Sequence, residues 1–200
     1  GLLDRGETEL ASCADEADVV VLATPVRTIV RMLDTIAPLL SDGSIVIDLG
    51  STKGYVTERM AQLPPHIQPL GAHPMCGREV SGIEAADPAL YQGCVFILTP
   101  LARTSPDALA LGSALVEAAG GRPLVLAPDR HDQLVAVASH LPYLLACALV
   151  AATEKVAQAD PLVWEICASG FRDTSRLAAS EVTMMLDILL TNQQAVLKAL

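Results

Sequence analysis

The hydrophobic pattern changes character along the chain. Through residue 128, short continuous apolar runs alternate with longer segments whose apolar residues recur at helical spacing. A continuous apolar run is typical of a strand that is buried on both faces of a parallel sheet. Five such runs predict strands at Asp18–Thr24, Ser44–Leu49, Gln68–Ala72, Cys94–Thr99 and Arg122–Ala127.

The segments between these runs predict helices. Pro25 opens a pattern that continues to Leu40 with one apolar stripe, and Ser105–Ala119 begins with a Ser-Pro-Asp cap and stops at a glycine pair. Further helices are predicted at Lys53–Leu63 and in a stretch that runs through Ala89. The alternation of strands and helices indicates βαβ units, and therefore a parallel sheet with right-handed crossovers.

The strand runs stop after Pro128. From His131 to the last residue the pattern is helical, with breaks expected near Pro142, Pro161 and Gly170. Such a change of class marks a domain boundary near Asp129. The sequence therefore predicts an α/β domain at residues 1–129 and an all-helical domain at residues 130–200.

Composition narrows the classes of function. The net charge of −10 argues against nucleic acid or an anionic membrane as a partner. The apolar stretch at residues 134–152 is interrupted by polar residues and by Pro142, which favours a buried helix over a membrane span. The five cysteines form neither a CxxC pair nor a metal-ligand pattern with histidine. Reduced thiols and a cytoplasmic location are expected.

The first candidate site residues lie where the strands end. An open parallel sheet binds its ligand at the carboxyl ends of its strands, here the segments after Leu22, Asp48, Ala72 and Leu126. Thr24, Pro25 and Val26 lie at the first of these ends, where free N–H groups at a helix start favour an anion or a dinucleotide. A plain strand-to-helix turn is the competing explanation.

The second and third strands are followed by a lysine and a histidine. Ser51 suits a helix cap as well as a ligand contact. Lys53 places a cation at a helix start, where positive charge is disfavoured, and an anionic substrate would supply a reason for it. His73 lies in a glycine- and proline-rich segment that holds its backbone tightly, with Gly82 further on. It is a candidate general base, although most lone histidines are structural.

Two polar clusters lie in the helical half. His131 and Ser139 fall near one helix face, and Tyr143 follows them closely. Arg172 and Arg176 are four residues apart and would share a face. Because guanidinium groups bind carboxylates through paired hydrogen bonds, this second cluster predicts a carboxylate clamp. A solvated Arg–Asp surface is the alternative.

Taken in order, these segments resemble the prephenate/arogenate dehydrogenase family. The resemblance extends from about Ala17 to Leu200 and rests on ATPV, DLGSTKG, GAHPMCGREVSG, HDxxxAxxSHLPY, GFRDTSRLA and MMLDILLTNQQAVLKAL. It implies a Rossmann-like nucleotide-binding domain, a helical dimerisation domain and a homodimer. It also implies oxidative decarboxylation of prephenate to 4-hydroxyphenylpyruvate, or of arogenate to tyrosine, with hydride transfer to NAD or NADP in tyrosine biosynthesis.

The resemblance also implies roles for individual residues. His73 would draw off the proton of the ring hydroxyl of the substrate, with Ser51 and Lys53 beside it as further catalytic residues. Substrate-binding positions are implied for Arg176, His131, Ser139, Tyr143 and Arg172. Cofactor-binding positions are implied for Thr24, Pro25, Val26 and Ser51. No metal is expected, because aromatisation of the ring drives the loss of carbon dioxide.

The chain departs from the family pattern at its two ends and at two single positions. The glycine-rich turn GxGxxG and the acidic residue after the second strand are absent, so roughly 30 residues of a first βαβ unit are expected to be missing. The C-terminal helices are likewise expected to be cut short. Tyr143 stands where the family often has histidine, and Met185 replaces a frequent tryptophan.

Two other interpretations stay open. A non-catalytic fragment or degenerate copy would act as a helical dimerisation module, although the retained polar residues of the predicted site count against decay. A β-hydroxyacid dehydrogenase would need a catalytic lysine in the helical domain, and Lys155 lies in no such motif. The sequence does not discriminate prephenate from arogenate, or NAD from NADP.

Overall fold

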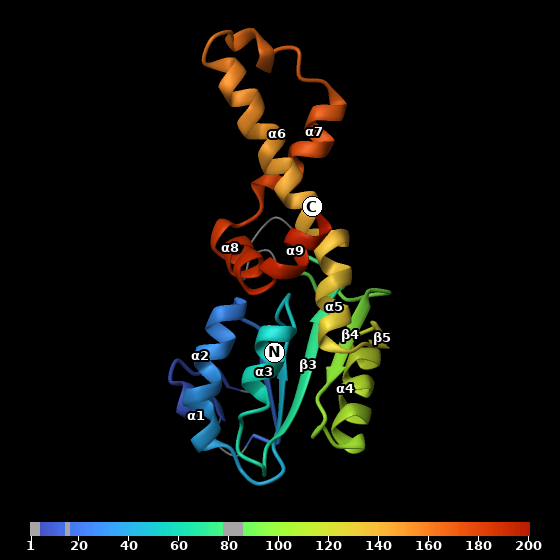
Figure 1. Ribbon diagram of the computed structural model, residues 1–200. Helices are drawn as coiled ribbons and strands as arrows, with labels where there is room; N and C mark the ends of the chain where they lie inside the picture. The colour runs from blue at the N-terminus through green and yellow to red at the C-terminus, as the bar shows by residue number, and fades with distance from the viewer. Residues whose placement is uncertain (1–4, 15–16, 78–85) are drawn as a thin grey trace. The chain divides into compact units, whose positions relative to one another are not determined.

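The first part of the chain folds around one five-stranded sheet. The computed structural model describes residues 5–14, 17–77 and 86–200 (Figure 1). The strand order along the sheet is the same as the order in the chain. The strands are β1 (Val19–Leu22), β2 (Ile45–Asp48), β3 (Gln68–Pro74), β4 (Val95–Pro100) and β5 (Arg122–Val125). All five lie within or overlap the apolar runs that predicted them.

The sheet is mixed rather than wholly parallel, which corrects the prediction. β1, β2 and β3 are parallel, but β4 runs antiparallel to β3, and β5 runs parallel to β4. A parallel return needs a crossover, usually a helix. The predicted helix through Ala89 falls partly on residues 78–85, outside the described residues, and residues 86–94 form turns instead. The Met75 N–H donates to the Val95 carbonyl at 2.8 Å and extends the antiparallel ladder.

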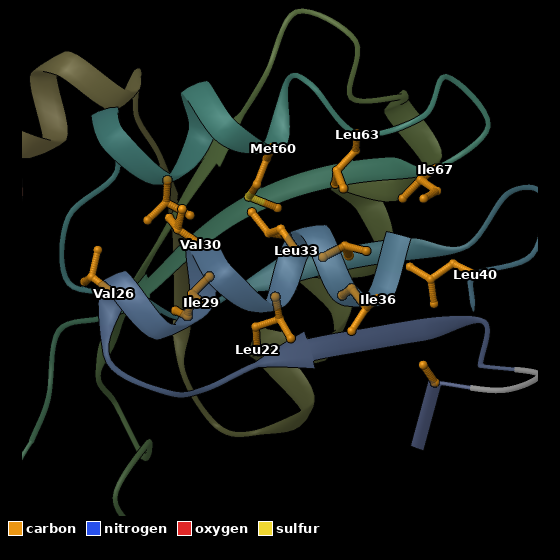
Figure 2. Packing of buried hydrophobic residues seen from close by; sticks show 13 residues of the cluster. Leu22, Val26, Ile29, Val30, Leu33, Ile36, Leu40, Met60, Leu63 and Ile67 are labelled. Carbon is orange, nitrogen blue, oxygen red and sulfur yellow. The ribbon is translucent and has the colours of Figure 1, made fainter. Parts of the chain in front are cut away.

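One face of the sheet carries two helices, α2 (Val26–Ile36) and α3 (Gly54–Met60). The apolar residues of α2 recur every three or four positions, so they form a single stripe. Figure 2 shows this stripe directed at the sheet and at Met60 of α3, with Leu33 beside Met60. Ile29 and Ile36 are fully buried there. The predicted helix from Pro25 to Leu40 is confirmed, with its last turn tightened to a 3-10 helix at Ala37–Leu39.

The opposite face is covered by α4 (Pro106–Ala118) next to the later strands (Figure 1). Ser105 caps this helix through its hydroxyl, which accepts from the Ala108 N–H at 3.1 Å, as the sequence predicted. A short helix, α1 (Leu10–Ala14), precedes β1. Because strand residues alternate in direction, Val46 packs under α2 while Ile47 packs on the α4 side. Two separate apolar clusters result.

The later part of the chain is helical. It contains α5 (Pro128–Val135), a π-helical segment (Ala136–His140), α6 (Leu141–Ala157), a 3-10 turn (Pro161–Trp164), α7 (Ser169–Ser175), a 3-10 turn (Arg176–Ala179), α8 (Val182–Thr191) and α9 (Gln193–Ala199). The predicted break near Pro142 is not present. Pro142 lies in the first turn of α6, where a missing N–H is tolerated, and the π-helical segment absorbs the change in hydrogen bonding.

The chain divides into two compact units. The α/β unit comprises the described residues up to Gly77 together with Asp87–Asp132, and the helical unit consists mainly of Gln133–Leu200. The division falls inside α5, whereas the sequence predicted it after Asp129. The helical run from Pro128 to Ala157 is long and apolar enough to cross a membrane by length and composition alone, a test that core helices also pass.

Candidate active site

The carboxyl ends of β1, β2 and β3 lie at one edge of the sheet. The strand register places Leu22 beside Asp48 and Asp48 beside Gly71, so the segments that follow these residues emerge together. The segment after Leu126 does not, because β5 runs the opposite way, and this corrects the predicted set of strand ends. Helix α5 follows β5 and places His131 next to the imidazole of His73 at the carboxyl end of β3.

Two histidine rings meet at the end of β3. His73 Nδ1 and His131 Nε2 lie 2.8 Å apart, and the rings pack edge to face with centroids 5.0 Å apart. His73 is partly exposed, whereas His131 is fully buried. The other ring nitrogen of His131, Nδ1, lies 2.8 Å from Asp132 Oδ1. Both nitrogens of His131 are therefore engaged within the protein.

Asp132 closes this line of hydrogen bonds at the start of α3. Its Oδ1 accepts from the Lys53 backbone N–H at 2.7 Å, and its Oδ2 accepts from the Gly54 N–H at 2.8 Å. Burial alone raises the pKa of this carboxyl, but the hydrogen bonds from His131, Lys53 and Gly54 outweigh it and lower the pKa below the ordinary value. Asp132 is an ionised acceptor at neutral pH.

Lys53 turns its side chain into the protein. The ammonium group is fully buried, pairs with Asp48 and donates to the Ala72 carbonyl at 2.6 Å. Burial lowers the pKa of Lys53 and raises that of Asp48, while their mutual attraction opposes both shifts. Contact with an anionic substrate does not fit this placement. Its neighbour Asp48, rather than a ligand, explains the cation at the start of α3.

The remaining predicted residues of the α/β unit lie along the same strand ends. Ser51 is partly buried just after β2. Thr24 and Pro25 are exposed between β1 and α2, and no side chain caps the start of α2. The side chain of Val26 packs in the core and is 3% exposed, so only its main chain is left to face a ligand.

The other predicted substrate residues belong to the helical unit. Ser139 is exposed in the π-helical segment, and Tyr143 is partly buried in the first turn of α6. Burial and the neighbouring Cys147 raise the pKa of Tyr143. Arg172 in α7 and Arg176 at the start of the next turn are both exposed. Residues 78–82 of the motif around His73, including Gly82, lie outside the described residues.

Two carboxylates of this arrangement were missed by sequence reasoning. Asp48 and Asp132 each carry several hydrogen bonds beside predicted site residues, yet neither was assigned a role. A signal existed for both. Asp48 ends an otherwise apolar strand, and Asp132 directly follows a histidine in the first turns of a helix, so each carboxylate needed a partner.

The fold and the histidine at the strand ends define a nucleotide-binding α/β unit joined to a helical unit. The family model described as "Prephenate dehydrogenase, nucleotide-binding domain" matches residues 1–134. The model described as "Prephenate dehydrogenase, dimerization domain" matches residues 127–200. The chain belongs to the prephenate dehydrogenase family.

Individual relatives agree with this membership. Prephenate dehydrogenase of Bacillus subtilis is 35% identical over 98% of this chain and 54% of its own length, so the chain spans about half of that relative. The structure of Aquifex aeolicus prephenate dehydrogenase in complex with hydroxyphenyl propionate and NAD+ is 35% identical, with a TM-score of 0.90, over 99% of this chain and 69% of that one. The structure of Synechocystis arogenate dehydrogenase is 33% identical in sequence, with a TM-score of 0.82. The match covers 99% of this chain and 71% of that one.

Proposed function

We propose that the complete protein carrying this chain oxidises prephenate or arogenate with NAD or NADP and releases carbon dioxide. The observation that carries the proposal is the partly exposed His73 at the shared strand ends, with His131 and Asp132 hydrogen-bonded behind it. An oxidation of an alcohol needs a group that takes the hydroxyl proton, and imidazole is a common general base in enzymes.

The residues present fit a dinucleotide at the end of β1. Helix α2 is eleven residues long, its start has no side-chain cap, and Thr24 and Pro25 are exposed there. An uncapped helix start at the carboxyl end of a parallel strand favours an anionic cofactor. Thr24 and the main chain of Val26 would contact it. When bound, the nicotinamide supplies the acceptor for the hydride.

His73 moves one proton twice in the proposed reaction. It takes the proton of the ring hydroxyl as the C–H electron pair leaves the same carbon as hydride, and the carbinol carbon becomes a carbonyl carbon. The bond to the ring carboxylate then breaks, its electron pair enters the ring, and carbon dioxide leaves. His73 returns the proton to the resulting phenolate oxygen, so the reaction consumes no net proton.

The helical unit supplies the proposed contacts to the rest of the substrate. Arg172 and Arg176 are exposed residues four positions apart, and paired guanidinium groups suit a carboxylate. Tyr143 is proposed to influence the choice between the keto side chain of prephenate and the amino side chain of arogenate. We also propose a homodimer, because this unit matches a dimerisation domain and exposes many large apolar residues.

The test uses the complete product of the gene. The purified protein is mixed with prephenate or arogenate and with NAD or NADP, and the absorbance of the reduced nicotinamide is followed in each of the four combinations. Turnover in at least one combination supports the proposal and identifies the substrate and the cofactor together. A folded dimer that turns over none of them contradicts it and favours the non-catalytic dimerisation module.

A further inference from the structure

The line of hydrogen bonds behind His73 joins three separate parts of the chain. His73 and His131 are 58 residues apart, and Lys53 is 79 residues from Asp132. The line runs from the end of β3 through a fully buried imidazole in α5 to two backbone N–H groups at the start of α3. Every link in it is between 2.7 and 2.8 Å long.

The direction of each hydrogen bond follows from Asp132. An ionised carboxylate only accepts, so His131 Nδ1 must carry a proton. When the imidazole of His131 is neutral, its lone pair lies on Nε2, which accepts from His73 Nδ1–H. In the neutral state of His73 the remaining lone pair lies on Nε2. The arrangement therefore selects one tautomer of His73, the one whose Nε2 accepts a proton.

The start of α3 holds the carboxylate in place. Its two N–H donors fix both oxygens of Asp132, so the carboxylate does not rotate away from His131. A Cβ atom on Gly54 would lie 3.0 Å from Asp132 Oδ2, closer than side chains ordinarily approach. Glycine at this position therefore permits the close approach of the carboxylate.

We infer that His131 and Asp132 are positioning residues that fix His73 in the Nδ1–H tautomer and so present Nε2 to the hydroxyl of the substrate. The inference rests on the proposed function for its catalytic consequence, but not for the tautomer itself. The family resemblance implied a substrate-binding position for His131. Its full burial and its two engaged nitrogens suit a place behind His73 instead. A histidine held in the wrong tautomer lacks a lone pair where the proton must go.

The tautomer can be measured without any substrate. Long-range ¹⁵N–¹H NMR of the histidine-labelled complete gene product separates Nδ1–H from Nε2–H imidazoles, and His73→Asn assigns the signal. We expect His73 to be Nδ1–H at a pH where it is neutral. Free histidine in water favours Nε2–H, so an Nε2–H signal assigned to His73 in the wild-type protein overturns the inference.

Two substitutions of His131 separate positioning from packing. His131→Phe keeps a ring but removes the acceptor, so His73 should shift toward Nε2–H and kcat should fall about 100-fold or more while KM changes little. His131→Gln places a carbonyl oxygen near the lost Nε2 and should keep the Nδ1–H tautomer and kcat within about tenfold. Equal losses in both variants, with the His73 tautomer unchanged, would assign His131 to packing and overturn the inference.

Failure of the inference and failure of the proposed function give different results. Turnover by a wild-type protein whose His73 is Nε2–H removes the inference and leaves the function. The second case is a protein that turns over neither substrate. If its His73 is Nδ1–H, and this tautomer is lost in His131→Phe but kept in His131→Gln, the positioning role stands and the proposed function is contradicted. Circular dichroism of each variant confirms that the fold is intact.

Discussion

The two units of this chain differ in where they place their large apolar residues. The α/β unit encloses one large apolar cluster between α2, α3 and the sheet, where Ile29 is 0% exposed (Figure 2), although Leu124 and Val125 of β5 lie at the surface. In the helical unit, α8 buries Met185 and Ile188 but exposes a stripe of apolar residues on another side: Val182, Leu186 and Leu190 are 61%, 53% and 58% exposed. The helical unit matches a dimerisation domain, and an exposed apolar stripe of this kind suits an interface between protein chains.

The largest stability effect is expected from Ile29→Ala. Removing a fully buried side chain from the cluster between α2, α3 and the sheet leaves a cavity, so the free energy of unfolding should fall by about 2–5 kcal/mol. Urea titration measures it. Leu186→Ala is the matched control in the helical unit and should change unfolding by less than about 0.5 kcal/mol at a concentration where the protein is monomeric. Equal losses would contradict the contrast between the units.

A smaller loss in the free energy of unfolding is expected from Gly71→Ala in β3. A Cβ atom at Gly71 would overlap the Thr99 hydroxyl and lie 3.1 Å from the Thr99 carbonyl oxygen, so the neighbouring strands must separate slightly. We expect a loss of about 1–3 kcal/mol in thermal or urea unfolding. Gly170→Ala in α7 is the control, because nothing lies within 4 Å of its Cβ position. A loss at Gly170 that matches the loss at Gly71 would show that space is not the cause.

Association should depend on the stripe of α8. Leu190→Asp places a charge on this exposed apolar surface, and the dimer dissociation constant should rise by at least about tenfold, or about 1.4 kcal/mol. Light scattering over a dilution series measures it. Ala114→Asp adds the same charge to the exposed side of α4 in the other unit and should leave association unchanged. If Leu190→Asp leaves the dimer dissociation constant unchanged and Ala114→Asp raises it, the interface lies in the α/β unit.

The smallest expected effect is the pH dependence of the stability that Asp132 contributes to the α/β unit. The pKa of Asp132 is lowered in the folded state, so its stabilising contribution is complete above the ordinary value of 3.8 and is lost as pH falls through the lower folded pKa. Asp132→Asn lacks this dependence. The advantage of the wild type, about 1 kcal/mol at neutral pH, should stay constant down to about pH 5 and shrink in more acid solution. An advantage that grows on acidification would contradict the assigned hydrogen bonds.

The sequence predicted where the elements lie better than how they run. Apolar runs located the five strands of the described residues. Most residues of β2, β3 and β4 are buried, which leaves such a local signal, although β5 is mostly exposed. The direction of β4 was predicted wrongly, because it depends on residues 75–94, whose composition favoured a helix although the described part forms turns. A hydrophobic run has the same appearance in a parallel and an antiparallel strand.

The site was predictable residue by residue but not as an arrangement. His73 stood out because of its glycine- and proline-rich surroundings at a strand end. Its contact with His131 was not predictable, since it depends on β5 running backwards and α5 returning to the strand ends. Lys53 was expected to face an anionic ligand, and only the structure shows its ammonium buried against Asp48. Pairing between distant polar residues leaves no periodic trace in the sequence.

The central claim is that His73, held by His131 and Asp132, takes the substrate proton. The most direct measurement compares kcat of His73→Asn with that of His66→Asn in the complete gene product, using the substrate and cofactor that the wild type turns over. His66 is the matched control, since it is an exposed histidine of the same unit. We predict that His73→Asn loses a factor of about 10²–10⁴ in kcat while His66→Asn keeps it. Equal kcat in the two variants would contradict the claim.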